Sequence, residues 1–193
     1  VLLPDPYYPD YPSGIALAGA HLALLPLDPE RGYAPRFDLA PRDDVAVAFL
    51  NYPSNPTAAA VKEGTFADAV AFARETGAAI VHDFAYGDLV FDERRPASFL
   101  AEPGAREVGV ELFSMSKSFG MAGWRLGFVV GSAELVARMT TLQDHLRAGI
   151  FTPIQQAGIA ALTGPQETVA ERAGLYERRR DRAYRRICGP SGA

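Results

Sequence analysis

The 193-residue sequence has a single cysteine and lacks long hydrophobic runs. Cys188 alone excludes an internal disulfide framework and fits a reducing compartment. The longest apolar stretches, such as residues 15–20 and 45–50, are far shorter than the roughly 20 residues that a membrane-crossing helix needs. No basic segment followed by an apolar core opens the chain. We therefore expect a cytoplasmic protein without a membrane partner.

A strong charge of either sign is also missing. The net charge is −4, which gives no general attraction to nucleic acid. The basic run at 178–180 is interleaved with Glu177 and Asp181, as expected for a solvated helix face. The three histidines do not stand at the close spacing of metal ligands, so we expect no metal site. With 48% apolar and 22% charged residues, the composition is that of an ordinary globular protein.

Lysine is the scarcest of the common charged residues. Only Lys62 and Lys117 occur among 19 basic residues, so the chain uses arginine almost everywhere else. An arginine keeps its proton at any useful pH, whereas a lysine amine can lose its proton and attack a carbonyl carbon. Lys117 lies in the run SMSKSFGMAGWR, residues 114–125. This context suggests a Schiff-base lysine beside a phosphate site, and the alternative is a plain surface lysine.

Short apolar runs alternate with helical patterns along the chain, which predicts an α/β fold with a mostly parallel sheet and helices on both faces. Gly77 is expected to stop one helix, and Ser132 to cap another. The expected strands are the end of one at 1–4, then 45–50, 78–81, 108–113 and 125–130, and the expected helices are 65–76, 133–147, 152–163 and 167–187.

Three polar segments follow the ends of expected strands, at 51–57, 82–86 and 114–125. In open α/β sheets, ligands bind beyond the carboxyl ends of the strands. The three segments are therefore expected to meet at one edge of the sheet and to form one site.

In order and spacing, these segments resemble the motifs of the fold-type I pyridoxal 5'-phosphate (PLP) enzymes, in particular the class I aminotransferases. The arginine eight residues beyond the lysine (125 − 117 = 8) matches that pattern. The resemblance implies that residues 1–164 form a large PLP-binding domain, incomplete at its N-terminus. It also implies that 165–193 form a long helix leading toward a missing small domain. We accordingly expect a central fragment of a longer enzyme.

The resemblance implies a role for each polar residue. Lys117 would form the Schiff base with PLP, and Asp83 would pair with the pyridine nitrogen. Tyr86 and Asn55 would hydrogen-bond to the ring hydroxyl O3′. Without the resemblance, a helix N-cap is the favoured interpretation of Asp83, and the alternatives are a turn residue for Asn55 and a half-buried aromatic for Tyr86. The family usually has glycine after its Asn-Pro-Thr run, whereas this chain has Ala58.

The resemblance also assigns the phosphate and the ring face of the cofactor. Ser114, Ser116 and Arg125 would hold the phosphate, since an arginine can contact two of its oxygens at once. Tyr8 would stack on the PLP ring, with Tyr7 and Tyr11 as weaker candidates. The alternative for the tyrosines is a surface loop rich in proline and tyrosine.

Within the family, the sequence looks most like the LL-diaminopimelate aminotransferases, which would place it in lysine biosynthesis. This implies an exchange between an amino acid and a 2-oxo acid in a homodimer, with LL-diaminopimelate and 2-oxoglutarate as the candidate pair. A PLP lyase of the same fold, of the β-C–S lyase or aminocyclopropane-carboxylate synthase type, and a truncated, non-catalytic remnant remain open. The similar segments are 49–53, 95–100, 103–109, 149–151 and 155–162.

Overall fold

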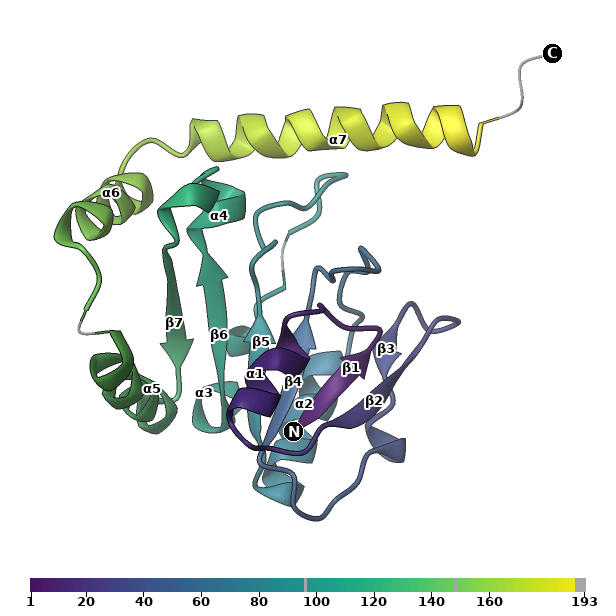
Figure 1. Ribbon diagram of the computed structural model, residues 1–193. Helices are drawn as coiled ribbons and strands as arrows, with labels where there is room; N and C mark the ends of the chain where they lie inside the picture. The colour runs from purple at the N-terminus through teal and green to yellow at the C-terminus, as the bar shows by residue number, and fades with distance from the viewer. Residues whose placement is uncertain (96, 148, 190–193) are drawn as a thin grey trace.

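The computed structural model describes residues 1–95, 97–147 and 149–189, and these form a seven-stranded sheet with the order β3-β2-β1-β4-β5-β6-β7 (Figure 1). Strands β1, β2, β4, β5 and β6 run parallel, and the two edge strands run antiparallel to their neighbours. The predicted mostly parallel sheet is therefore confirmed. The strands are β1 (Leu2–Asp5), β2 (Ala23–Asp28), β3 (Ala34–Pro35), β4 (Val47–Asn51), β5 (Ala79–Asp83), β6 (Gly109–Ser114) and β7 (Gly127–Gly131).

One face of the sheet packs on helix α2 (Thr65–Thr76) to form the main core. Alternate residues of the central strands, such as Leu50 and Ile80, have no exposed surface there. Residues on one side of α2 are buried against them, as its 3.6-residue periodicity predicts. Gly77 ends α2 in the left-handed conformation, with φ of 75°, and donates its N–H to the Ala73 carbonyl.

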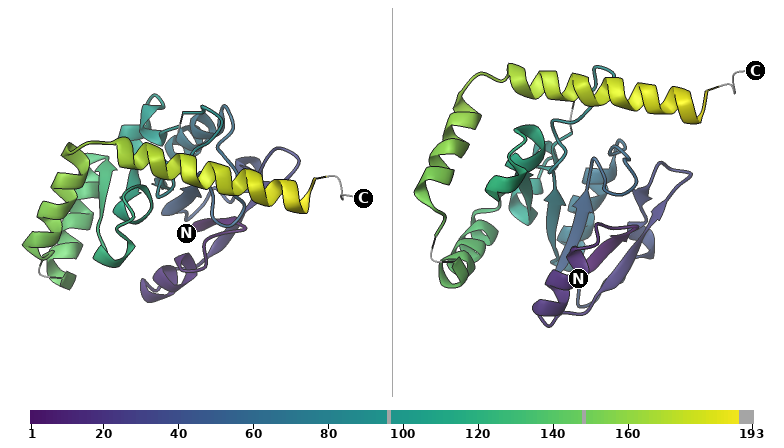
Figure 2. Two further views of the ribbon diagram at one scale, coloured as in Figure 1. Left: turned by 90° about the horizontal axis from the view of Figure 1, so that it is seen from above. Right: turned by 45° about the horizontal axis from the view of Figure 1, so that its top comes forward.

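The opposite face is covered by α1 (Tyr11–Leu17) and α5 (Ala133–Arg147), so helices lie on both faces as predicted (Figure 2). The two helices do not meet. Between them an apolar groove of about 450 Å³ exposes Val47, Phe49 and Val81 from the sheet.

Two of the remaining helices, α4 (Met115–Ser118) and α7 (Glu167–Ile187), lie at the carboxyl-end edge of the sheet (Figure 1). The long helix α7 runs across that edge, above the end of β6 (Figure 1). No helix among the described residues is both long enough and apolar enough to cross a membrane. The other elements are α3 (Ala105–Val108), α6 (Thr152–Thr163) and the 3₁₀ turns η1 (Phe37–Leu39), η2 (Phe99–Ala101) and η3 (Ala122–Trp124).

Four predicted helices have the bounds that the structure shows, but several other expectations were wrong in detail. The strand expected from residue 125 begins at Gly127, because residues 122–124 form a 3₁₀ turn and Arg125 is left-handed. Val108 ends a short helix and does not begin β6. The pattern also missed α1 and the two strands that follow it. Of the segments named from the sequence, Pro96 and residues 190–193 lie outside the described part of the chain.

Candidate active site

The three polar segments do meet at one edge of the sheet. They enclose a cavity of about 320 Å³ beyond the carboxyl ends of β4, β5 and β6, and a side chain from the loop after β1 completes its wall. All eight residues singled out in the sequence line this cavity: Tyr8, Asn55, Asp83, Tyr86, Ser114, Ser116, Lys117 and Arg125.

Asp83 is the last residue of β5, and both of its carboxylate oxygens are held. Oδ1 accepts the N–H of Ala85 at 3.1 Å, and Oδ2 accepts the hydroxyl of Tyr11 at 2.6 Å. Turns and no helix follow β5, so the helix N-cap reading of Asp83 is wrong. A carboxylate has about four acceptor positions, so it retains capacity for a donor in the cavity.

Tyr11 is a site residue whose contact sequence reasoning missed, because the sequence suggested ring stacking and not a hydrogen bond. Its hydroxyl reaches Asp83 from the start of α1, 72 residues away in the chain. Burial, followed by the charge of Asp83 and the hydrogen bond to it, raises the pKa of Tyr11 far above its ordinary value. The hydroxyl therefore remains a donor to Asp83. The spacing of Tyr11 from Tyr8, three residues on, was the only signal in the sequence.

Asn55, Tyr86 and Lys117 lie together on the next wall. The side-chain nitrogen of Asn55 is 3.5 Å from the Tyr86 hydroxyl, and the Lys117 amine is 5.4 Å from the centre of the Tyr86 ring. Lys117 is exposed, and it is the only one of the two lysines that lines the cavity. The amine is therefore accessible to a carbonyl group that enters the cavity.

Ala58 stands where the family usually has glycine, and the loop that carries Asn55 forms its turn with this alanine. Ala58 has φ of 57°, in the left-handed region that favours glycine, and its N–H reaches the Ser54 carbonyl at 2.9 Å. An alanine in this conformation costs roughly 1–2 kcal/mol relative to ordinary backbone. The usual glycine of the family is thus explained by the turn, which this chain forms with some strain.

Ser114, Ser116 and Arg125 form the far wall. The Ser114 hydroxyl caps α4 by accepting the Ser116 N–H at 3.2 Å, which leaves its own hydrogen to donate. Arg125 has φ of 53°, in the left-handed region that is uncommon for residues other than glycine. Its guanidinium also donates to the Ala122 carbonyl at 3.1 Å. Two hydroxyls and a guanidinium make this wall suited to an anion.

Tyr8 is more than a third exposed at the cavity mouth. Its ring meets the Tyr11 ring edge to face, with centroids 5.5 Å apart, and its hydroxyl donates to Asp10 at 2.7 Å. Of the three tyrosines considered for stacking, Tyr8 is the one that lines the cavity. An aromatic face is thereby available to a flat ligand.

A second cavity, of about 660 Å³, adjoins the first, since Asn55, Tyr86 and Lys117 line both. Its outer wall includes Tyr176 and Arg180 of α7. Within the part of the chain that the structure describes, no cluster of three or more His, Cys, Asp or Glu residues could hold a metal ion.

The donor set matches what PLP requires of a protein. The walls of one cavity carry the groups that the cofactor needs: an amine, a carboxylate, a phenol with an amide, and a guanidinium with two hydroxyls. They surround it at the carboxyl edge of an α/β sheet, where such ligands bind. The sheet and its helices are those of the fold-type I PLP enzymes.

Comparison with known proteins agrees with this class. Residues 1–188 match the family described as aminotransferase class I and II, so the chain belongs to that family, whose members use PLP. It is 42% identical over 184 residues to the L-glutamine–4-(methylsulfanyl)-2-oxobutanoate aminotransferase of Bacillus subtilis, covering 94% of this chain and 46% of that protein. It is 44% identical to an LL-diaminopimelate aminotransferase of Desulforudis audaxviator, with 94% and 47% coverage.

Solved structures show the same relationship. The structure of apo-BacF from Bacillus subtilis superposes with a TM-score of 0.89 at 44% identity, covering 93% of this chain and 48% of that one. The aromatic aminotransferase of Pyrococcus horikoshii has a TM-score of 0.88 at 27% identity, with 96% and 51% coverage. The chain thus spans about half the length of the curated relatives it matches.

Proposed function

We propose that this chain carries the cofactor site of a PLP-dependent aminotransferase, which exchanges the amino group of an amino acid with a 2-oxo acid. The observation that carries the proposal is the convergence of eight chemically matched side chains on one cavity around Lys117. Membership of the aminotransferase family supports the reaction type.

In this proposal each wall of the cavity holds one part of the cofactor. The phosphate lies against Arg125 and the two serines, the pyridine nitrogen faces Asp83, and Tyr8 covers the ring. When bound, PLP supplies an electron sink for the electron pair that remains at the substrate Cα after its proton leaves. The Asp83 carboxylate favours a protonated pyridine nitrogen, because opposite charges stabilise each other. Lys117 is the group that moves the proton, since this residue lines both cavities.

The substrate amino acid enters, in this proposal, through the larger cavity beside Lys117. LL-diaminopimelate with 2-oxoglutarate is a suitable pair on the sequence resemblance. The relative named for methylsulfanyl-oxobutanoate is 42% identical, the one named for LL-diaminopimelate is 44% identical, and transaminase BacF is 45% identical. These values are so close that sequence identity alone does not rank the candidate substrates. We further propose a cytoplasmic homodimer as the working form of the whole enzyme.

The test is to incubate the chain with PLP, reduce it with borohydride and locate the attached pyridoxyl group by peptide mass mapping. We expect the label on Lys117, because its amine lines the cavity. Lys62→Arg is the matched control, since Lys62 is the only other lysine, and it should keep the label. Lys117→Arg should lose it. Label on Lys62 alone would sink the proposal.

Reaction type is tested on a full-length relative and on this chain with the same amino acids. An aminotransferase converts bound PLP to its amine form when an amino acid is added without a 2-oxo acid, which changes the absorbance spectrum. A lyase of the same fold would keep Lys117, Asp83 and Tyr86 but release products without accumulating that form. Failure of both reactions in the presence of labelled Lys117 would support a binding remnant.

A further inference from the structure

His82 and Glu111 form a completely buried polar pair on the face of the sheet opposite the cavity. Their side chains are 0% and 1% exposed. The rings of Phe66, Phe84 and Phe99 surround the imidazole, with centroids 4.9–6.4 Å away. His82 and Asp83 are successive residues of β5, and successive side chains of a strand point to opposite faces of the sheet. Burying such groups is costly unless every polar atom has a partner.

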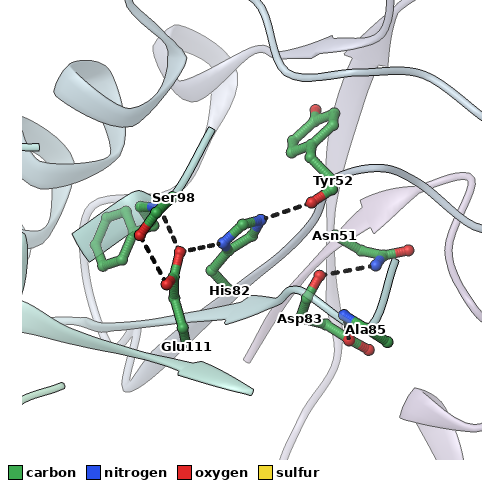
Figure 3. A network of polar contacts seen from close by, with 8 residues as sticks. Asn51, Tyr52, His82, Asp83, Ala85, Ser98 and Glu111 are labelled. Carbon is green, nitrogen blue, oxygen red and sulfur yellow. Dashed lines mark hydrogen bonds and ion pairs between the residues drawn. The ribbon is translucent and has the colours of Figure 1, made fainter. Parts of the chain in front are cut away.

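Every polar atom of the pair does have a partner (Figure 3). His82 Nδ1 lies 2.9 Å from Glu111 Oε1, and Nε2 lies 3.1 Å from the Tyr52 carbonyl oxygen. The Ser98 hydroxyl donates to Glu111 Oε2 at 2.8 Å, and the Phe99 N–H donates to Oε1. A carbonyl oxygen only accepts, so Nε2 carries a hydrogen, and one further proton lies between Nδ1 and Glu111.

These contacts join three adjacent strands, just after the end of β4, near the end of β5 and in the middle of β6. Tyr52 directly follows β4, His82 lies in β5 and Glu111 lies in β6. A reciprocal bond lies close by, where the Asn51 side chain of β4 donates to the Asp83 carbonyl of β5 at 2.9 Å (Figure 3). Each of the two central strands therefore uses a side chain to hold a carbonyl at the end of the other.

The joined strands are the three that carry the candidate site. The strand β4 leads to Asn55, whose N–H is held by the Asn51 side-chain oxygen at 2.7 Å. The strand β5 ends at Asp83, and β6 leads to Ser114 and Lys117. Relative movement of these strand ends would change the distances between the groups that contact the cofactor.

Stability alone does not account for the pair. Well-packed apolar residues of similar volume in place of a buried ion pair are often neutral or stabilising. The aromatic surroundings of His82 would accept a phenylalanine ring. An apolar pair would lack the directed hydrogen bonds that link β5 to β6 and β5 to the residue that follows β4.

We propose that His82 and Glu111 are positioning residues: they form a brace behind the sheet that sets where Asp83, Asn55 and Lys117 stand relative to one another. The inference rests on the proposed function for its consequence, weaker and less ordered PLP binding when the brace is cut. The brace itself is a property of the chain and can be measured without the cofactor.

The variant that cuts the brace is the double substitution His82→Phe with Glu111→Gln. The phenylalanine keeps the aromatic packing. The glutamine oxygen keeps an acceptor for the Phe99 N–H, and its NH2 group can donate to the Ser98 hydroxyl, so the links to Tyr52 and between β5 and β6 are what is removed. Ile80→Val is the matched control, since Ile80 is fully buried on the same face of the same strand and loses packing only.

The first readout is amide hydrogen exchange in the chain without PLP. The exchange rate of the Ala85 N–H measures how firmly the Asp83 carboxylate is held, because the two groups are hydrogen-bonded. The Leu25 N–H in β2 is a distant reference. We expect Ala85 to exchange about tenfold faster in the double variant than in Ile80→Val, with Leu25 unchanged. If the Ala85 N–H exchanges at the same rate in the double variant as in Ile80→Val, the proposed positioning role is wrong.

The second readout is the dissociation constant of PLP, measured by titration of the wild type, the double variant and the control. We expect about tenfold weaker binding in the double variant and less than a twofold change in Ile80→Val. Unchanged affinity beside faster exchange also overturns the positioning role. If the wild type fails to bind PLP, the proposed function fails, while the exchange result still decides the brace.

Should the double variant fail to fold, His82→Gln carries the same measurements. A glutamine retains one donor for the Tyr52 carbonyl, so partial rescue is expected: Ala85 should exchange faster than in Ile80→Val but remain protected. Exchange of Ala85 no faster than in the control would again overturn the inference.

Discussion

Glu111 favours its charged form although its side chain is only 1% exposed. Burial by itself would raise the pKa of Glu111, but hydrogen bonds from His82 and Ser98 outweigh it and hold that pKa below its usual value. The folded state therefore binds the Glu111 proton less readily than the unfolded chain does. This difference in proton affinity links one buried side chain to the stability of the whole fold.

The pH dependence follows from the lowered pKa. The contribution of Glu111 to the free energy of unfolding is fully present above the pKa that Glu111 has in the unfolded chain, about 4.3. This contribution is lost as the pH falls through the lower pKa of the folded state. In urea unfolding followed by circular dichroism, we expect the stability difference between wild type and Glu111→Gln to be largest at neutral pH and to shrink below about pH 4. A difference that grows on acidification would contradict the lowered pKa.

Asp83 and Tyr11 show at the same scale how a site residue is oriented by a distant one. The Tyr11 hydroxyl holds one carboxylate oxygen of Asp83, and the Ala85 N–H holds the other. The carboxylate is thus kept in one rotamer before any ligand arrives, which reduces the ordering cost of binding.

At the scale of elements, α2 illustrates local agreement between sequence and fold. Its apolar residues follow the helical period, and Gly77 supplies the left-handed conformation that ends it. The helix α7, in contrast, depends on distant contacts. Arg172 donates to the Ser118 carbonyl at 2.6 Å, and Arg180 pairs with Asp92 at 2.7 and 2.8 Å. These bonds join α7 to α4, which contains Lys117, and to the loop that follows Tyr86.

Two glycines in open space give a matched test of backbone conformation. A Cβ added at Gly77 or at Gly14 would meet nothing within 4 Å, so steric clash plays no part in either. Gly77 has φ of 75°, whereas Gly14 lies inside α1. We expect Gly77→Ala to lower the free energy of unfolding by about 1 kcal/mol, and Gly14→Ala to raise it by about 0.4–1 kcal/mol. Urea unfolding measures both, and equal effects would contradict the assigned conformations.

At the scale of the whole molecule, the chain leaves a large apolar area open. Between α1 and α5 the groove of about 450 Å³ exposes the sheet face. Large apolar side chains on α5 and α6, such as Leu142, Leu146 and Ile159, are also exposed. Apolar areas of this kind are uncommon on isolated monomers and favour association.

We therefore expect the 193-residue chain to bind an apolar fluorescent dye and to self-associate. Dye titration and sedimentation velocity check this, with a full-length relative as the control. We also expect the chain to bind PLP more weakly than that relative and to transaminate little, because remote binding groups contribute to turnover as well as to affinity. A monomer that excludes the dye and reaches the relative's full activity would contradict both expectations.

Much of this protein follows from local sequence signals. Periodicity and stop residues determined the helices α2, α5, α6 and α7, because those signals act within a few residues. The apolar runs determined β4 to β6, since the central strands of a parallel sheet with helices on both faces are apolar along their length. The order of the three polar segments at strand ends also predicted which side chains would share a cavity, since parallel strands bring their carboxyl ends to one edge.

Other features were decided only by the tertiary structure. The element α1 carries Pro12 and Gly14, and β2 carries Pro26, so neither shows a clear local period. The bond from Tyr11 to Asp83 spans 72 residues, and the pairing of His82 with Glu111 spans 29. No local pattern encodes such contacts, because they form only when the order of strands in the sheet brings distant segments together. The sequence by itself determined which chemical groups the site has, and the packing of the sheet decided how they are held.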